Sequence, residues 1–159
     1  MWDLTRGQVS QTLEGFRNSV FWLCLSPNEK YLAAAVGSLN RDLSASGPGE
    51  VLVWDATTAR QVYHLRGHPN SVFSVAFSPD SRRLVSAGGE RLSKSAGEVK
   101  IWDMDTGLEV ATPKGFTGAV YGVAFSPCGT RLATCGEGGA VKIWDGTPLA
   151  ETPSRKEID

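Results

Sequence analysis

Residues 67–103 are GHPNSVFSVAFSPDSRRLVSAGGERLSKSAGEVKIWD, and two signals in this segment recur along the chain. The first is an apolar run that ends in Ser-Pro, at residues 72–79. The second is a short apolar stretch that ends in Trp-Asp, at residues 99–103. Trp-Asp is found at residues 2–3, 54–55, 102–103 and 144–145, and Ser-Pro at 26–27, 78–79 and 126–127. Internal similarity of this kind indicates a repeat protein.

The spacing of the two signals shows which half of the repeat is constant. Each Trp-Asp aspartate precedes the next Ser-Pro proline by 24 residues, at 3 to 27, 55 to 79 and 103 to 127. Each proline precedes the next aspartate by 28, 24 and then 18 residues. All the length variation therefore lies between the Ser-Pro turn and the following Trp-Asp.

Each unit is predicted to form four short β-strands and no helix, because no segment shows a sustained apolar period of 3.6 residues. The first strand ends at the Ser-Pro turn, where proline presets φ and serine, asparagine or aspartate can bond the local backbone. The second strand follows that turn, the third ends in Trp-Asp, and the fourth comes after a further short turn. The predicted first strands are Val20–Leu25, Val72–Phe77 and Val120–Phe125; the second are Tyr31–Val36, Arg83–Ala87 and Arg131–Cys135; the fourth are Arg60–Leu65 and Leu108–Ala111, with an N-terminal copy at Gln8–Leu13.

The predicted first strands have two uncharged faces of different size. Strict alternation in the second unit places Phe73, Val75 and Phe77 on a large face, and Val72, Ser74 and Ala76 on a small face. A half-exposed strand would alternate apolar with charged residues, so both faces are expected to be buried between neighbouring sheets. The first unit departs from this pattern, because Trp22 on its small face would overpack an ordinary contact between sheets.

The chain resembles the WD-repeat β-propeller family over roughly residues 1–145. The matching features are the four Trp-Asp pairs, the Phe-Ser-Pro turns at 77–79 and 125–127, and the Gly67-His68 pair. The resemblance implies all-β blades of four antiparallel strands arranged around a channel, with the first strand innermost. It also implies that the loops after the second and fourth strands share one rim, the usual partner-binding face.

The resemblance further implies a hydrogen-bonded set of His, Ser or Thr, Asp and Trp that ties each blade together. The second unit has His68, Ser86 and Trp102, but Ala96 stands where the family has aspartate. The third unit has Phe116, Thr134, Gly138 and Trp144 at these positions, and the first has Phe16, Ala34 and Trp54 without an acidic partner. No blade has the complete set, so the blades are expected to rely on apolar packing.

The predicted strands divide the chain into five parts. These are a displaced outer strand at 1–15 that completes another blade, blade 1 at 16–66, blade 2 at 67–112, the inner three strands of blade 3 at 113–145, and a C-terminal tail at 146–159. Propellers usually close with four to eight blades, so we expect three blades per chain to close a ring by oligomerisation. We favour a homodimer with N-terminal strand exchange, which makes six blades. A nine-bladed trimer and a fragment of a longer propeller are the alternatives.

Composition and charge exclude several classes of function. The 159 residues carry 16 basic and 17 acidic side chains, a net charge of −1, which argues against non-specific nucleic-acid or membrane-surface binding. The longest apolar run, Val20–Leu25, is too short to cross a membrane. Three cysteines without a Cys-x-x-Cys pair favour a reduced, cytoplasmic setting. No catalytic, cofactor or metal motif is found, and His64 and His68 are expected to have structural roles.

The candidate partner-binding surface is the rim that carries the variable loops. Two insertions, at residues 37–49 and 88–97, lengthen the connections between second and third strands. Arginine and aromatic residues are common anchors at interfaces, which favours a binding role for this rim. The candidate rim residues are Phe16, Arg17, Asn40, Arg41, Asp42, His68, Asn70, Arg91, Lys94, Phe116 and Glu137. The insertions can equally be tolerated surface loops, and Phe16 and Phe116 can be blade-packing residues.

Three functional hypotheses follow. The first is a non-enzymatic scaffold that binds a protein or peptide through the rim. The second is a self-assembling structural module that forms a six-bladed homodimer. The third is a propeller fragment of a larger multidomain protein whose catalytic part lies elsewhere.

Overall fold

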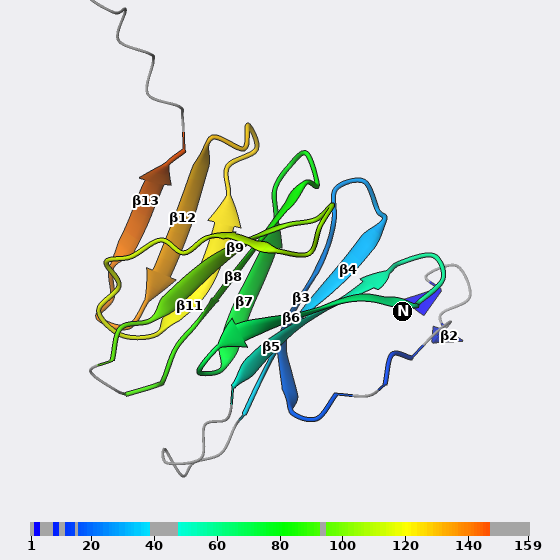
Figure 1. Cartoon of the computed structure of the whole chain (residues 1–159), viewed down its shortest axis with the longest axis horizontal. Helices are drawn as coiled ribbons and strands as arrows, with labels where there is room; N and C mark the ends of the chain where they lie inside the picture. The colour runs from blue at the N-terminus through cyan, green and yellow to red at the C-terminus, as the bar shows by residue number, and fades with distance from the viewer. Residues whose placement is uncertain are drawn as a thin grey trace, which may run out of the picture.

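The structure, a computed structural model, describes residues 2–3, 8–9, 12–14, 16–38, 48–92 and 95–146. All regular structure within these residues is β-strand, and Figure 1 shows the larger sheets arranged side by side. Blade 1 consists of β3 (Ser19–Leu25), β4 (Tyr31–Gly37), β5 (Gly49–Asp55) and β6 (Gln61–His68). Blade 2 consists of β7 (Val72–Phe77), β8 (Arg83–Gly88), β9 (Glu98–Asp103) and β10 (Glu109–Ala111). Blade 3 consists of β11 (Val120–Phe125), β12 (Arg131–Gly136) and β13 (Val141–Asp145).

Neighbouring strands within each blade are consecutive in the chain and antiparallel. The order is β3-β4-β5-β6 in blade 1, β7-β8-β9-β10 in blade 2 and β11-β12-β13 in blade 3. This meander confirms the predicted all-β class and the antiparallel blades. The predicted closure into a ring by oligomerisation stays a prediction.

The N-terminal residues form a fourth, smaller sheet. It consists of β1 (Trp2–Asp3) and β2 (Gln8–Val9), with Trp2 opposite Val9 and Asp3 opposite Gln8. The predicted outer strand Gln8–Leu13 is therefore shorter in the structure, because residues 12–14 have no regular structure. This strand, β2, pairs with β1 of the same chain. The tail from residue 147 onward lies outside the described residues.

A β-bulge near the start of each inner strand changes the predicted faces. The register shifts between Val72 and Ser74 in β7, and likewise between Val20 and Trp22 in β3 and between Val120 and Gly122 in β11. A bulge inserts one unpaired residue and reverses the alternation on one side of it. The prediction that Val72 shares a face with Ser74 was therefore wrong, since Val72 belongs to the same core cluster as Val75.

The core is split into layers between the blades. One buried cluster joins Val51 and Val53 of β5 to Val75 and Phe77 of β7. A second joins β8 and β9 of blade 2 to Phe116, Val120 and Leu132 at blade 3. Trp22 avoids the predicted overpacking, because it is 55% exposed and does not fill the layer between blades 1 and 2.

In blades 1 and 2, the aspartate of the Trp-Asp pair accepts the hydrogen bonds that hold the turn leading into the outer strand. Asp55 Oδ1 accepts hydrogen bonds from the backbone N–H groups of Thr57 (3.0 Å) and Thr58 (2.7 Å) and from the Thr58 hydroxyl (2.9 Å). Asp103 accepts the same set from Asp105 and Thr106. The bonds from Thr58, the backbone bond first, hold the pKa of Asp55 below its ordinary value. Trp-Asp thus combines a core residue with the acceptor for the next turn.

The layered core predicts a large cost for a cavity between blades 1 and 2. Leu84 is 0% exposed within this cluster, so Leu84→Ala is expected to lower the free energy of unfolding by about 2–5 kcal/mol. Leu108→Ala is the matched control, because Leu108 is 66% exposed and its truncation should cost about 0.5 kcal/mol or less. Urea unfolding followed by tryptophan fluorescence measures both. Equal losses for the two variants would contradict the layered core.

Candidate functional site

The loops after the second strands lie beside the loops that connect the blades. Ser38 donates its backbone N–H to Ser71 Oγ (3.1 Å), and Gly49 donates to the carbonyl oxygen of Asn70 (3.1 Å). On the other side of the same connection, Gly89 donates its N–H to the Ser71 carbonyl oxygen (3.0 Å). The connection at residues 69–71 is therefore held between the loops of blades 1 and 2. These adjoining loops form one rim of the blades.

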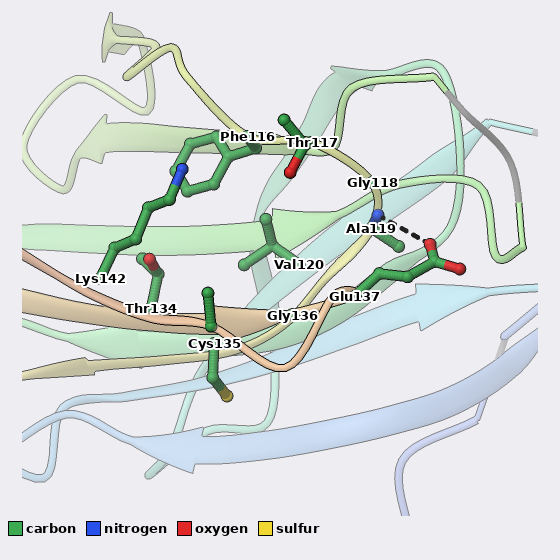
Figure 2. A pocket seen from close by; sticks show the side chains of 11 residues that line it. Phe116, Thr117, Gly118, Ala119, Val120, Thr134, Cys135, Gly136, Glu137 and Lys142 are labelled. Carbon is green, nitrogen blue, oxygen red and sulfur yellow. Dashed lines mark hydrogen bonds between the residues drawn. The ribbon is translucent and has the colours of Figure 1, made fainter.

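Glu137 makes the corresponding link between blades 2 and 3. Its Oε1 accepts a hydrogen bond from the backbone N–H of Leu92 (3.1 Å), and its Oε2 accepts one from Ala119 (3.3 Å). Figure 2 shows the Glu137 side chain reaching Ala119 beside a small pocket, with Phe116 and Lys142 also lining it. The pocket offers about 30 Å³, which suits one or two water molecules and not a cofactor.

The predicted rim residues separate into accessible and internal ones. Arg17 and Arg91 are exposed, and Asn70 and Glu137 are half-buried. His68 and Phe116 are buried at 2% and 8% exposure, so their side chains lie inside the blades. Four further candidates, Asn40, Arg41, Asp42 and Lys94, lie outside the described residues.

An aromatic row crosses the three inner strands next to this rim. The rings of Phe21 and Phe73 have centroids 5.3 Å apart, and the rings of Phe73 and Tyr121 are also 5.3 Å apart. All three residues occupy the bulge positions of β3, β7 and β11, which the register leaves outside the regular pairing. We call these three residues the aromatic row. Tyr121 is 39% exposed, and the two phenylalanines are half-buried.

Sequence reasoning missed the aromatic row because it assumed unbroken alternation along the inner strands. The signal was present, since an aromatic residue directly follows the first valine of every inner-strand run. The three pairs are Val20-Phe21, Val72-Phe73 and Val120-Tyr121. Recurrence at one position of each repeat would have identified the row without a structure.

A hydrogen-bonded chain through the middle of blade 2 explains the burial of His68. Trp102 Nε1 donates to Ser86 Oγ (2.8 Å), and Ser86 Oγ lies 2.7 Å from His68 Nε2. The Ser86 hydroxyl can donate to Nε2, which leaves the proton of the imidazole on Nδ1. That Nδ1 faces Glu98 Oε2 at 3.5 Å, and neither atom has another polar partner among the described residues. Only the tautomer with the proton on Nδ1 avoids a lone pair facing the carboxylate.

Glu98 therefore takes the acidic position that the sequence analysis expected to be empty. Ala96 stands where the family places aspartate, but the acid is supplied two residues later, from β9. Blade 2 therefore adds these polar contacts to the apolar packing that the sequence predicts. The neighbouring His68 side chain, through its hydrogen bond, holds the pKa of Glu98 below its ordinary value.

In the other two blades a phenylalanine ring packs on the tryptophan where blade 2 has the bonds of His68. In blade 3, Trp144 Nε1 donates to Thr134 Oγ1 (3.0 Å), and the Trp144 ring lies 5.1 Å from the Phe116 ring. In blade 1, Phe16 packs on Trp54 with ring centroids 5.3 Å apart. The two phenylalanines occupy the place that His68 has in blade 2, which matches their blade-packing interpretation.

Chemistry-bearing side chains are dispersed over the described part of the molecule. No group of three or more His, Cys, Asp or Glu side chains able to hold a metal ion is found among the described residues. His64 lies on the outer strand β6 with Nε2 3.0 Å from Glu50 Oε1. No described helix is long and apolar enough to span a membrane.

Two of the three cysteines have contrasting surroundings. Cys128 is exposed in the third Ser-Pro turn, with its Sγ 3.3 Å from Ser126 Oγ and 3.1 Å from Thr130 Oγ1. These hydroxyl contacts, that of Ser126 first, lower the pKa of Cys128 to about 7. Burial raises the pKa of Cys24 to about 12.

The contrast predicts selective modification of Cys128. A thiolate is the reactive form, so carbamidomethylation of Cys128 should rise to half its maximal rate near pH 7, while Cys24 stays unmodified in the folded protein. Peptide mass spectrometry across a pH series measures both rates. In Ser126→Ala the midpoint should move to higher pH, and an unmoved midpoint would show that the hydroxyl contacts are not the cause.

The pairing of Glu98 with His68 predicts a pH-dependent contribution to stability. Because folding lowers the pKa of Glu98, its contribution is fully present above the ordinary value of 4.5 and is lost as the pH falls through the folded value. Glu98→Gln should therefore lower the urea midpoint at pH 7, and the difference from the original protein should shrink below pH 4.5. Glu14→Gln, at an exposed position, is the control. A difference that is constant with pH would rule out the contact between the Glu98 carboxylate and His68 as its cause.

The comparisons with known proteins agree with this geometry. The WD40 family description (WD domain, G-beta repeat) matches residues 7–55, 59–103 and 107–145. Among curated relatives, Centriole proteome protein 16 of Chlamydomonas reinhardtii is 39% identical over 69 residues, which is 38% of this chain and 3% of that protein. WD repeat-containing protein 1 of Bos taurus is 36% identical over 58 residues, which is 35% of this chain and 10% of that protein.

A relative from a named complex matches a longer segment. The target of rapamycin complex subunit wat1 of Schizosaccharomyces pombe is 31% identical over 88 residues, which is 54% of this chain and 24% of that protein. The chain thus spans only a minor part of the length of each of these relatives. None of the three names denotes an enzyme.

The matched repeats are offset from the blades of the structure. Each match begins at an outer strand (β2, β6 or β10) and ends with the Trp-Asp of the next blade. Three successive matches cover most of the chain, and their strands build the three antiparallel sheets. The chain belongs to the WD40 repeat family.

Proposed function

We propose that the chain is a non-enzymatic scaffold that binds a protein or peptide across its rim, with the aromatic row as the central anchor. The observation that carries this proposal is the continuous contact of three rings from three blades, each 5.3 Å from the next. The bulge at each position directs the ring out of the layers between the blades. These aromatic side chains are therefore not required to fill the core.

The surroundings of the aromatic row support a protein or peptide ligand. Arg17 and Arg91 are exposed on the loops of the same rim, and arginine and aromatic residues are the usual anchors of interfaces. The hydrogen bonds at Ser71 and Glu137 hold the adjoining loops in place, which lowers the entropic cost of binding. The candidates at residues 40–42 and 94 belong to the same proposed rim.

The relatives and the cysteines add further support. One relative is named as a subunit of a complex, which is the role proposed for this chain. The described cysteines are all free thiols, as suits a protein that works in the reducing cytoplasm. We therefore propose a cytoplasmic location.

The proposal predicts that the Tyr121 ring and the Arg91 guanidinium contribute much of the binding free energy. Peptides selected on the immobilised chain from a random library are expected to lose affinity about 10-fold or more in Tyr121→Ala and in Arg91→Ala, measured by calorimetry. Arg131→Ala is the matched control, because Arg131 is 63% exposed in its side chain but lies beyond the Ser-Pro turn, at the opposite end of the inner strands. Selected peptides that bind the rim variants as tightly as the original chain would overturn the proposal.

A further inference from the structure

Blade 3 has an apolar face that nothing covers among the described residues. Val141 and Ile143 of β13 are 69% and 70% exposed. They pair with Cys135 and Ala133 of β12, so the register places all four side chains on the same face of the sheet. The equivalent residues of blade 1, Val51 and Val53, pair with Ala35 and Ala33 and are both 0% exposed, because blade 2 covers them. We call the Val141–Ile143 side of blade 3 the trailing face.

Blade 1 has exposed apolar residues of the opposite kind on its inner strand, while Leu52 and Trp54 on the same face are covered by Leu13 and Phe16. Leu23 and Leu25 of β3 are each 55% exposed. Their register partners are Ala34 and Leu32. The equivalent residues of blade 2 are Val75 and Phe77, which are 1% and 7% exposed because they pack on blade 1. We call the Leu23–Leu25 side of blade 1 the leading face.

The chain itself shows that these two kinds of face pack together. Between blades 1 and 2, the trailing-type residues Val51 and Val53 meet the leading-type residues Val75 and Phe77. Between blades 2 and 3, Val99 and Ile101 of β9 and Val85 and Ala87 of β8 pack with Val123 and Phe125 of β11. Both contacts between the described blades therefore join one trailing face to one leading face, and these three blades leave one exposed face of each kind.

The two free faces lie at opposite ends of the arc. β7 contacts both β3 and β11, so blade 2 stands between the other two blades. Figure 1 shows β11–β13 and β3–β6 on opposite sides of blade 2. Each of these two faces is open to packing against a further blade.

We propose that a second copy of this chain covers both faces, with the trailing face of each copy packed on the leading face of the other. Two such contacts close a ring of six blades, within the usual range for propellers. Both contacts reproduce the packing that the chain already uses twice. The arrangement is head-to-tail at the level of the blades and closes by a two-fold axis.

The same ring gives a place to β2. The strand that comes just before each inner strand in the chain is the outer strand of the preceding blade: β6 comes before β7, and β10 before β11. By the same order β2, which comes before β3, corresponds to the outer strand of a blade that precedes blade 1. In the ring the preceding blade is blade 3 of the second copy, where no described strand pairs with the outer edge of β13. The proposal therefore includes an exchange in which β2 leaves β1 and pairs with β13 of the other copy.

The mass in solution tests the proposal directly. Light scattering on a sizing column should give twice 17.0 kDa, falling toward 17.0 kDa on dilution. A mass of 17.0 kDa at every concentration would overturn the proposal. Three times 17.0 kDa would overturn the two-copy ring in favour of nine blades.

Two charge substitutions test which faces meet. Ile143→Glu and Leu23→Glu change exposed positions of the single chain, so each variant should fold and yet raise the dissociation constant of the homodimer about 100-fold or more. Leu108→Glu, at a position 66% exposed outside both faces, should leave the constant unchanged. Circular dichroism checks that each variant remains folded.

Mixing the two variants separates the head-to-tail contact from its alternatives. An equimolar mixture of Ile143→Glu and Leu23→Glu contains one unmodified trailing face and one unmodified leading face on different chains. The mixture should therefore associate more tightly than either variant alone. If Leu23→Glu dimerises normally while Ile143→Glu does not, the trailing faces meet each other and the proposal fails.

The strand exchange has its own test. Val9→Pro removes a backbone donor from β2, so it should weaken the homodimer by about 10-fold if β2 pairs with β13 of the other copy. An unchanged dissociation constant would overturn the exchange and leave the packing of the faces standing.

Discussion

The contact between a trailing and a leading sheet face is the interaction on which the rest of the structure depends. Each blade has only three or four strands and cannot bury an apolar face alone. Both faces of blade 2 are covered, and residues such as Leu84, Val85 and Val99 are 0% exposed there. Burial of this kind favours uncharged side chains on both sides of the sheet, and the buried Lys100 of β9 is paired with Glu109 at 2.8 Å. The same requirement explains why apolar residues occupy successive positions in the strands of every repeat.

The bulges of the inner strands connect this packing to the rim. Without a bulge, Phe73 would continue the alternation of Val75 and Phe77 and would have to fit between blades 1 and 2. The register shift turns it toward Phe21 and Tyr121 instead. A local irregularity in hydrogen bonding thus supplies large apolar side chains to the surface without opening the core. The same scaffold can therefore keep its packing while the rim residues vary.

The sequence predicted the strands and the family because those depend on patterns that recur every repeat. Trp-Asp and Ser-Pro each combine a core residue with a turn residue, so their spacing marks both the strands and the connections. Glu98 was missed because its carboxylate, on β9 of blade 2, reaches His68 at the end of β6 in the neighbouring sheet, from a position outside the family motif. The bulges were missed because alternation over six residues gives no sign of an extra, unpaired residue. Side-chain reach and local register are properties of the folded backbone.

The offset between repeats and blades has a consequence for how the molecule comes apart. The connections from β6 to β7 and from β10 to β11 each join two blades covalently, while the clusters join the same blades through packing. A chain built in this way behaves as a linear array of neighbours, in which loss of order begins at the ends. Blade 2, coupled on both sides and held by the chain from Trp102 to Glu98, should keep its slowest-exchanging amides until the whole array unfolds.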